Sequence, residues 1–167
     1  AELLITVTGV NDAPVAVANT NEVPENGSID LAAASSVLGD DADVDGDALT
    51  VSSIRTGNVA ATDGAQGEIG STLVGAYGVL TLNADGQYRY ATTASAVDGL
   101  AAGATAVDVF TYTITDGALS ASAELLITVT GVNDAPVAVA DTLDATEDTP
   151  ETYTAAQLVG NDADVEN

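Results

Sequence analysis

The residues with the most evident chemistry are the carboxylates of one short acidic segment, Asp41-Ala-Asp43-Val-Asp45-Gly-Asp47. Four aspartates at alternate positions repel one another unless a cation lies among them. Alternate spacing lets a turning backbone direct several oxygens at one centre, and Ca²⁺ accepts roughly six to eight oxygens in irregular geometry. The segment therefore predicts a calcium site.

Two other structures share this pattern. An EF-hand loop begins in the same way, but counting from Asp41 places Ser52 where that loop needs a bidentate glutamate, and Leu49–Val51 is typical of a strand rather than a helix. A solvated turn is the simpler alternative, because Asp and Gly are common turn formers. It is the better interpretation of an isolated pair such as Asp85-Gly86. The dense like charge of 41–47 favours the metal.

The composition of the whole chain also points to a cation. The 167 residues include 26 Asp+Glu and two Lys+Arg, for a net charge of −24, yet 46% are hydrophobic. The hydrophobic residues lie in alternating runs, which is typical of a folded chain rather than a disordered acidic one. Since only Arg55 and Arg89 could form internal salt bridges, a divalent cation is the natural counter-charge.

The same composition excludes several functions. The negative charge would repel nucleic acid and anionic membrane surfaces, and no run of about 20 apolar residues predicts membrane insertion. Without His or Cys the usual nucleophile–base pairs are absent, so only a carboxylate pair could catalyse a reaction, and we expect no enzyme activity. The lack of cysteine also excludes disulfides, which leaves metal as one of the few available stabilisers.

The chain contains an internal repeat of domain size. AELLITVTGVNDAPVAVA at 1–18 recurs without change at 123–140. A period this long describes a whole domain rather than one turn of a solenoid. We therefore expect the chain to be a segment of a tandem array. The expected division is 1–10 as the last strand of one repeat, 11–132 as a complete repeat, and 133–167 as the opening part of the next.

The pattern of β-branched and apolar residues predicts several short strands. Turns containing Asp-Gly separate two pairs of them, which favours antiparallel hairpins. A helical turn is expected only within 91–102. Short strands with regular turns predict an all-β, immunoglobulin-like β-sandwich. The expected strands are 3–8, 14–21, 28–34, 49–54, 80–82, 87–90, 109–114 and 120–132.

The connectivity predicts which polar residues meet. If strand 14–21 runs from one end of the sandwich, the top pole, to the other, the bottom pole, with 108–115 and 119–132 in the second sheet, each end gathers its own acids. The top pole holds Asn11, Asp12, Asp41, Asp43, Asp45 and Asp116, and the bottom pole holds Glu25, Asp108, Asn133 and Asp134. In a stack of repeats the next top pole would add Asp162 and Asp164. These residues are the predicted Ca²⁺ ligands, shared between adjacent repeats of the same chain.

Several of these motifs resemble a known family. Asn-Asp-Ala-Pro at each junction, Pro24-Glu25-Asn26, the Asp-x-Asp-x-Asp run and Phe110–Gly117 resemble the bacterial cadherin-like repeat. Tyr77–Tyr90, followed by Leu100–Gly103, more specifically resembles the VCBS repeat of large bacterial surface adhesins and biofilm proteins. The resemblance covers nearly all of 11–133 and implies a cadherin-like sandwich, junctional calcium, export by a type I secretion route, and an extender role at the cell surface.

One departure from the repeat concerns the predicted junction. The second copy has Asp164-Val165-Glu166-Asn167 where the first has Asp43-Val44-Asp45-Gly46, which leaves it open whether the junction site is complete. With calcium bound, the junction carboxylates would be held together and a flexible string of repeats would become a stiff rod. The sequence thus predicts a calcium-rigidified repeat that serves cell adhesion.

Two further functions remain open. Tyr77, Tyr88, Tyr90 and Tyr112 could form a stripe that binds a glycan or a protein, although a half-buried core edge is the favoured interpretation of these side chains. The segments 1–10 and 133–167 could also complete neighbouring molecules end to end, as in a self-assembling extracellular filament.

Overall fold

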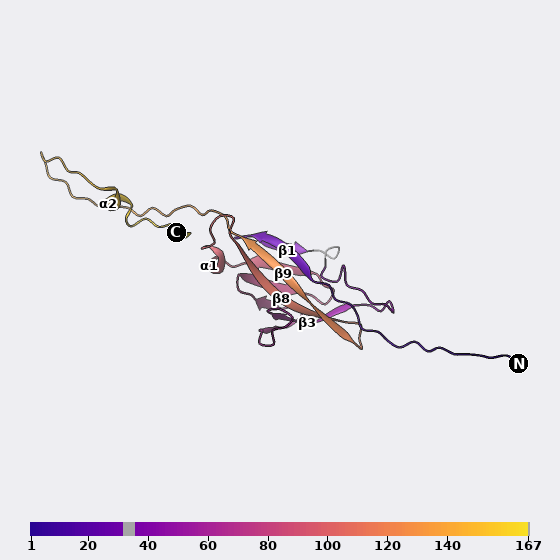
Figure 1. Cartoon of the computed structure of the whole chain (residues 1–167). Helices are drawn as coiled ribbons and strands as arrows, with labels where there is room; N and C mark the ends of the chain where they lie inside the picture. The colour runs from indigo at the N-terminus through magenta and orange to yellow at the C-terminus, as the bar shows by residue number, and fades with distance from the viewer. Residues whose placement is uncertain (32–35, 167) are drawn as a thin grey trace.

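The computed structural model describes residues 1–31 and 36–166, and its strands lie between the two ends of the chain, which extend in opposite directions (Figure 1). The strands are β1 (Asn19–Pro24), β2 (Ser28–Leu31), β3 (Thr50–Thr56), β4 (Gln66–Gly67), β5 (Thr72–Val74), β6 (Gly78–Leu82), β7 (Tyr88–Thr92), β8 (Thr105–Thr115) and β9 (Ser120–Thr130). Two short helices, α1 (Ala94–Val97) and α2 (Ala155–Val159), complete the elements of the described residues.

The strands form two sheets, which confirms the predicted all-β sandwich. The five-stranded sheet has the order β1-β9-β8-β3-β4, and the four-stranded sheet has the order β2-β7-β6-β5. Neighbouring strands are antiparallel except for β1, which runs parallel to β9. Parallel neighbours need a long connection; here almost the whole repeat lies between β1 and β9.

Both predicted hairpins are confirmed. β6 pairs with β7 across the Asp85-Gly86 turn, in which the Asp85 carboxylate accepts a hydrogen bond from the backbone nitrogen of Gln87 at 3.1 Å. β8 pairs with β9 over eleven residues of each strand. This long hairpin carries its chain from the bottom pole to the top pole and back, and therefore joins Asp116 to the exit at Asn133.

The first strand differs from its prediction in position and in sheet. β1 begins at Asn19 and pairs with β9, so it belongs to the sheet that contains β8 and β9 rather than to the opposite sheet. The reason is the corner after Pro24, where Asn26 adopts a φ of 59° and the chain crosses to β2 in the other sheet. The predicted strand 28–34 is observed as Ser28–Leu31, and its remainder lies outside the described residues.

Residues 1–10 show how much a strand depends on its neighbours. Their sequence is identical to 123–132, most of which is β9, yet they form no strand in this structure. Leu3 is 83% exposed, whereas its counterpart Leu125 is completely buried. The difference arises because the two neighbours of β9, which are β1 and β8, are already paired with residues 120–130.

The core lies between the two sheets and is aromatic at its centre. Tyr90 and Phe110 are fully buried and meet edge to face, with ring centroids 6.3 Å apart. Tyr112 is also fully buried, and Tyr88 is 4% exposed. Three of the four tyrosines proposed as a binding stripe are therefore part of the core, and the interpretation of these three as a surface stripe is wrong.

Leu125→Ala tests which of the two identical segments supplies the strand. We expect it to lower the free energy of unfolding by about 3 kcal/mol, because a buried leucine loses its packing and leaves a cavity. Leu3→Ala is a matched control in the same five-residue sequence context, and we expect a change within about 0.5 kcal/mol since Leu3 is exposed. Urea unfolding measures both variants. Equal losses would contradict the assignment of β9.

Candidate metal centres at the two poles

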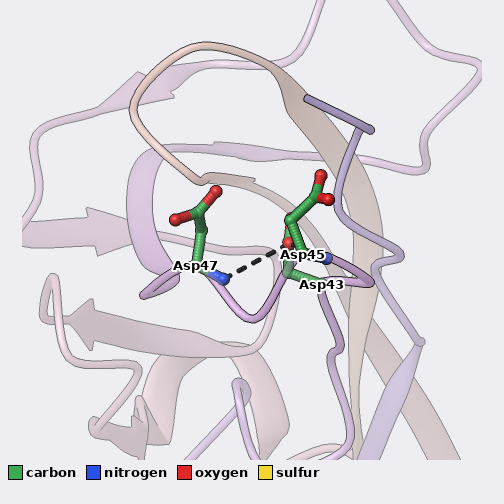
Figure 2. A group of neighbouring side chains, drawn as sticks. All are labelled: Asp43, Asp45 and Asp47. Carbon is green, nitrogen blue, oxygen red and sulfur yellow. Dashed lines mark hydrogen bonds between the residues drawn. The ribbon is translucent and has the colours of Figure 1, made fainter. Parts of the chain in front are cut away.

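The acidic segment forms a tight loop at the top pole. The Asp43 carboxylate accepts hydrogen bonds from the backbone nitrogens of Asp45 at 2.9 Å and Asp47 at 3.3 Å. Between them Gly46 adopts a φ of 81°, which residues with a side chain rarely adopt. One carboxylate oxygen from each of Asp43, Asp45 and Asp47 lies within 4.8 Å of the others, and Figure 2 shows the three side chains on one turn of backbone.

The linker before the repeat is fastened to this loop and to the tip of the long hairpin. The backbone nitrogen of Asp12 donates to an Asp45 carboxylate oxygen at 2.8 Å. The side-chain amide of Asn11 donates to an Asp116 carboxylate oxygen at 3.0 Å, across 105 residues of sequence. The structure therefore brings together the linker, the loop and the hairpin tip at the top pole.

Two carboxylate oxygens at this pole are buried without a hydrogen-bond partner. Asp41 uses one oxygen to accept the backbone N–H of Val17 at 2.7 Å, while its other oxygen is buried and unpaired. The second carboxylate oxygen of Asp43 is also buried and has no hydrogen-bond partner. Burial raises the pKa of Asp41, and the hydrogen bond from Val17 opposes this shift. A buried oxygen of this kind fits a bound cation, and that of Asp43 belongs to the group with Asp45 and Asp47.

Asp116 has the opposite electrostatic character. Hydrogen bonds from the backbone nitrogens of Leu119 and Ala118, followed by the amide of Asn11, lower the pKa of its carboxyl group. The side chain is therefore ionised over the whole neutral range and available as an anionic ligand.

Asp41→Asn tests the buried charge through the pH dependence of metal-free stability. Because the folded-state pKa of Asp41 is raised, the folded state binds this proton more tightly, and wild-type stability gains from its protonation as the pH falls from about 7 to about 4. The variant cannot gain in this way, so the melting midpoint of the wild type should improve relative to the variant over that range. Asp63→Asn, at an exposed site, controls for the lost charge. A constant difference between wild type and Asp41→Asn would contradict the prediction.

At the bottom pole, Glu25 fastens the end of β9 to the start of the linker. Its backbone nitrogen donates to the Thr130 carbonyl at 2.8 Å, and one carboxylate oxygen accepts the backbone N–H of Val132 at 2.7 Å. The side chain is 3% exposed, and its second oxygen is buried without a partner. A buried carboxylate that is only half satisfied is costly, so this oxygen fits a bound cation.

The second copy of the repeated sequence, in residues 133–166, reproduces the geometry of the top pole. Asp162 accepts the backbone N–H of Val139 at 2.8 Å, as Asp41 accepts that of Val17. Asp164 accepts the N–H of Glu166 at 3.1 Å, as Asp43 accepts that of Asp45. In the first copy Val15 and Ala42 form an isolated antiparallel bridge. Their counterparts in the second copy, Val137 and Ala163, form the same bridge.

Glu166 takes the place of Asp45 in this second loop. Its carboxylate accepts the backbone N–H of Asp134 at 3.1 Å, which is the bond that Asp45 makes to Asp12. Its other oxygen is buried and unpaired. The departure seen in the sequence thus lengthens one side chain and keeps the contact that Asp45 makes in the first loop.

The two repeats meet around a polar cavity of about 230 Å³, whose lining includes Asn133, Asp164 and Glu166 together with Ala101 and Ala102 of the α1–β8 connection. Asn133 donates its amide N–H to the carbonyl of Asp134 at 2.7 Å. The donor set is therefore two carboxylates and one amide, and these oxygen ligands are the kind that calcium prefers.

Asp108 is placed differently from its prediction. It is 3% exposed, and its two carboxylate oxygens accept hydrogen bonds from the backbone nitrogens of Ala76 at 2.7 Å and Tyr77 at 3.0 Å and from the hydroxyl of Tyr90 at 2.6 Å. Burial and the neighbouring carboxylate raise the pKa of Tyr90, so its hydroxyl remains a donor. Asp108 holds a turn against the core, and these contacts give no support to a ligand role.

Sequence reasoning missed three residues near the poles. Asp47 belongs to the acidic segment but was not counted as a ligand, although alternate spacing indicated it. Glu166 was treated as a departure, while its carboxylate matched the position of Asp45. Asp98 precedes β8 and lies beside Asp134 in the lining of a second junction cavity; no motif in the sequence could have indicated it.

Among comparisons with known proteins, a family model agrees with the fold. The model of the bacterial cadherin-like domain matches residues 11–131. Two solved structures of an endo-fucoidan hydrolase of glycoside hydrolase family 107 are similar in part: the H294Q variant at 25% identity with a TM-score of 0.40, and a second structure at 26% identity with a TM-score of 0.35. The match to the H294Q variant covers 80% of this chain and 17% of the hydrolase chain. The match to the second structure covers 77% of this chain and 15% of the hydrolase chain. A search of curated proteins found no match.

Proposed function

Because the chain belongs to the bacterial cadherin-like domain family, we propose that it is a calcium-binding extender repeat of a bacterial cell-surface adhesin. The observation that carries this proposal is the set of buried carboxylate oxygens without partners at the poles. Two of them belong to Glu25 and Glu166, whose other oxygens accept the backbone N–H groups of Val132 and Asp134, two residues apart in the connection.

A cation shared between repeats would act on the linker 133–136. Without metal, repulsion among the carboxylates opposes close approach of the two repeats, and the linker bends easily. Asn133, Asp164 and Glu166, which line the same cavity, would hold the cation, and Glu25 and Asp134 are the nearest acidic residues along the connection. Binding to the folded state alone would also stabilise each repeat.

The setting that fits this function is outside the cell. Sites of this kind in extracellular modules bind calcium with dissociation constants of about 10⁻⁴ to 10⁻³ M, so they fill only where calcium is abundant. Export by a type I route, a place at the bacterial surface and a part in biofilm formation belong to the same proposal. In residues 1–31 and 36–166 no helix is long and apolar enough to cross a membrane. A structural rather than a catalytic role follows from the same proposal.

Calcium titration of the 167-residue chain tests this function. We expect calcium binding in the range of about 10⁻⁴ to 10⁻³ M by isothermal titration calorimetry. At a free concentration of about 100 times the dissociation constant, the free energy of unfolding should rise by about 2.7 kcal/mol per site. Magnesium at the same concentration should raise it much less, since it demands a stricter octahedral geometry. Equal melting midpoints in calcium and in chelator would overturn the proposal.

A further inference from the structure

The connection between α1 and β8 is a rigid platform at the bottom pole. The backbone nitrogen of Gly103 donates to the Gly131 carbonyl at 2.9 Å, and the nitrogen of Gly131 donates to the Ala104 carbonyl at 2.8 Å. A β-carbon on Gly131 would lie only 2.5 Å from the carbonyl oxygen of Ala101, so the connection rests directly on the end of β9. At its start Val97 is fully buried.

The next repeat rests against this platform. A β-carbon built on Gly99 would lie 4.0 Å from the backbone oxygen of Val165. A cavity of about 360 Å³ lies beside this contact, and its lining includes Asp98 from the platform and Val137 and Val165 from the next repeat. The polar cavity that contains Glu166 includes Ala101 and Ala102 of the same platform. Asp98, Gly99, Ala101 and Ala102 therefore face the second copy, while Leu100 packs against the core.

The chain contains an internal control for this contact. Val44 holds the position in the first acidic loop that Val165 holds in the second. Val44 is 78% exposed, whereas Val165 is 54% exposed. The same residue in the same loop is thus more buried where residues 98–102 are its neighbours.

We propose that residues 98–102 are the docking surface on which the following repeat of the same chain sits, and that this contact sets the angle between repeats. Cations hold the two repeats together, and the platform determines their relative orientation. The part of this proposal in which cations hold the repeats together rests on the proposed function. The contact at residues 98–102 is between protein atoms and does not require a cation. Its occupant is the acidic loop of the next repeat, at Val165.

Gly99→Trp tests the docking surface. The backbone of Gly99 is outside the positive-φ region, so a side chain fits without backbone strain, and a tryptophan would act as a wedge against Val165. Gly99→Ala is the matched control, because its β-carbon would make ordinary van der Waals contact. The chain has no cysteine, so a pair introduced at the exposed residues Ser53 and Thr152 takes spin labels specifically.

Distances between the two labels are measured by double electron–electron resonance, with saturating calcium and with chelator. In calcium we expect Gly99→Trp to shift the mean distance by several ångström while Gly99→Ala follows the wild type. Calcium affinity should change less than about threefold, since the carboxylates are untouched. Identical distance distributions for all three proteins in calcium would overturn the docking surface and leave the calcium function standing. Absence of calcium binding in the wild type would overturn the calcium function, and the distances in chelator would then decide the docking surface.

Discussion

Glu25→Gln is expected to lower the calcium affinity of the junction by about tenfold or more, because the affinity of such sites is set largely by ligand charge. The same substitution should raise the melting midpoint of the metal-free chain by a few degrees. The two effects have opposite signs because the buried carboxylate is unfavourable without a cation and is needed with one. Glutamine keeps the length of the side chain and an oxygen that accepts the Val132 N–H.

Titration calorimetry measures the affinity, and thermal melting in chelator and in calcium measures the crossover. Glu22→Gln is the matched control: it removes the same charge from an exposed position of β1, three residues away. We expect the control to follow the wild type in both conditions. A fall in metal-free stability of Glu25→Gln with unchanged affinity would show that Glu25 only fastens Val132.

Asp108→Ala is expected to remove about 3 to 5 kcal/mol from the free energy of unfolding, because a buried carboxylate is lost and three donors, among them the buried Tyr90 hydroxyl, lose their acceptor at once. Such a loss is a large part of the roughly 5 to 15 kcal/mol that stabilises a typical domain. The turn packs so closely against Asp108 that a β-carbon at Gly75 would lie 2.6 Å from the Asp108 carboxylate, which explains the glycine at this position. Alanine at 108 would therefore leave a space that the turn cannot simply fill.

Urea unfolding in chelator measures this loss without any contribution from metal. Tyr90→Phe removes only one of the three donors and should cost about 1 to 2 kcal/mol; it also remains informative if Asp108→Ala fails to fold. Calcium affinity of Tyr90→Phe should equal that of the wild type. A calcium-dependent loss for Tyr90→Phe would restore Asp108 as a member of the metal centre.

The hairpins were predictable from sequence because their signals are local. An Asp-Gly turn between alternating runs specifies β6 and β7 without reference to the rest of the chain. The sheet of β1 was not predictable in this way, because it depends on the corner at Asn26 and on a partner about one hundred residues away. Residues 1–10 make the same point, since a sequence identical to β9 forms no strand where it has no neighbours.

The top pole was predictable because its carboxylates are dense and evenly spaced. Such carboxylates repel one another, so their presence in one loop indicates a compensating cation. Asp108 was expected at a pole because it opens the predicted strand 108–115, whereas β8 begins three residues earlier at Thr105 and the three donors to Asp108 come from β7 and from the turn before β6. The role of Glu166 required coordinates, because only the bond to Asp134 shows that a longer side chain makes the contact of Asp45.

The parallel pairing of β1 with β9 has a mechanical consequence. Tension along the array enters near Asn19 and leaves near Thr130, at opposite ends of two strands that run in the same direction. The ladder between them, from Asn19–Leu125 to Pro24–Thr130, is then loaded in shear, so its hydrogen bonds must yield together rather than one at a time. Resistance to forced unfolding is governed by the unfolding rate, and this arrangement places the connection that resists shear where such a load would pass through the domain.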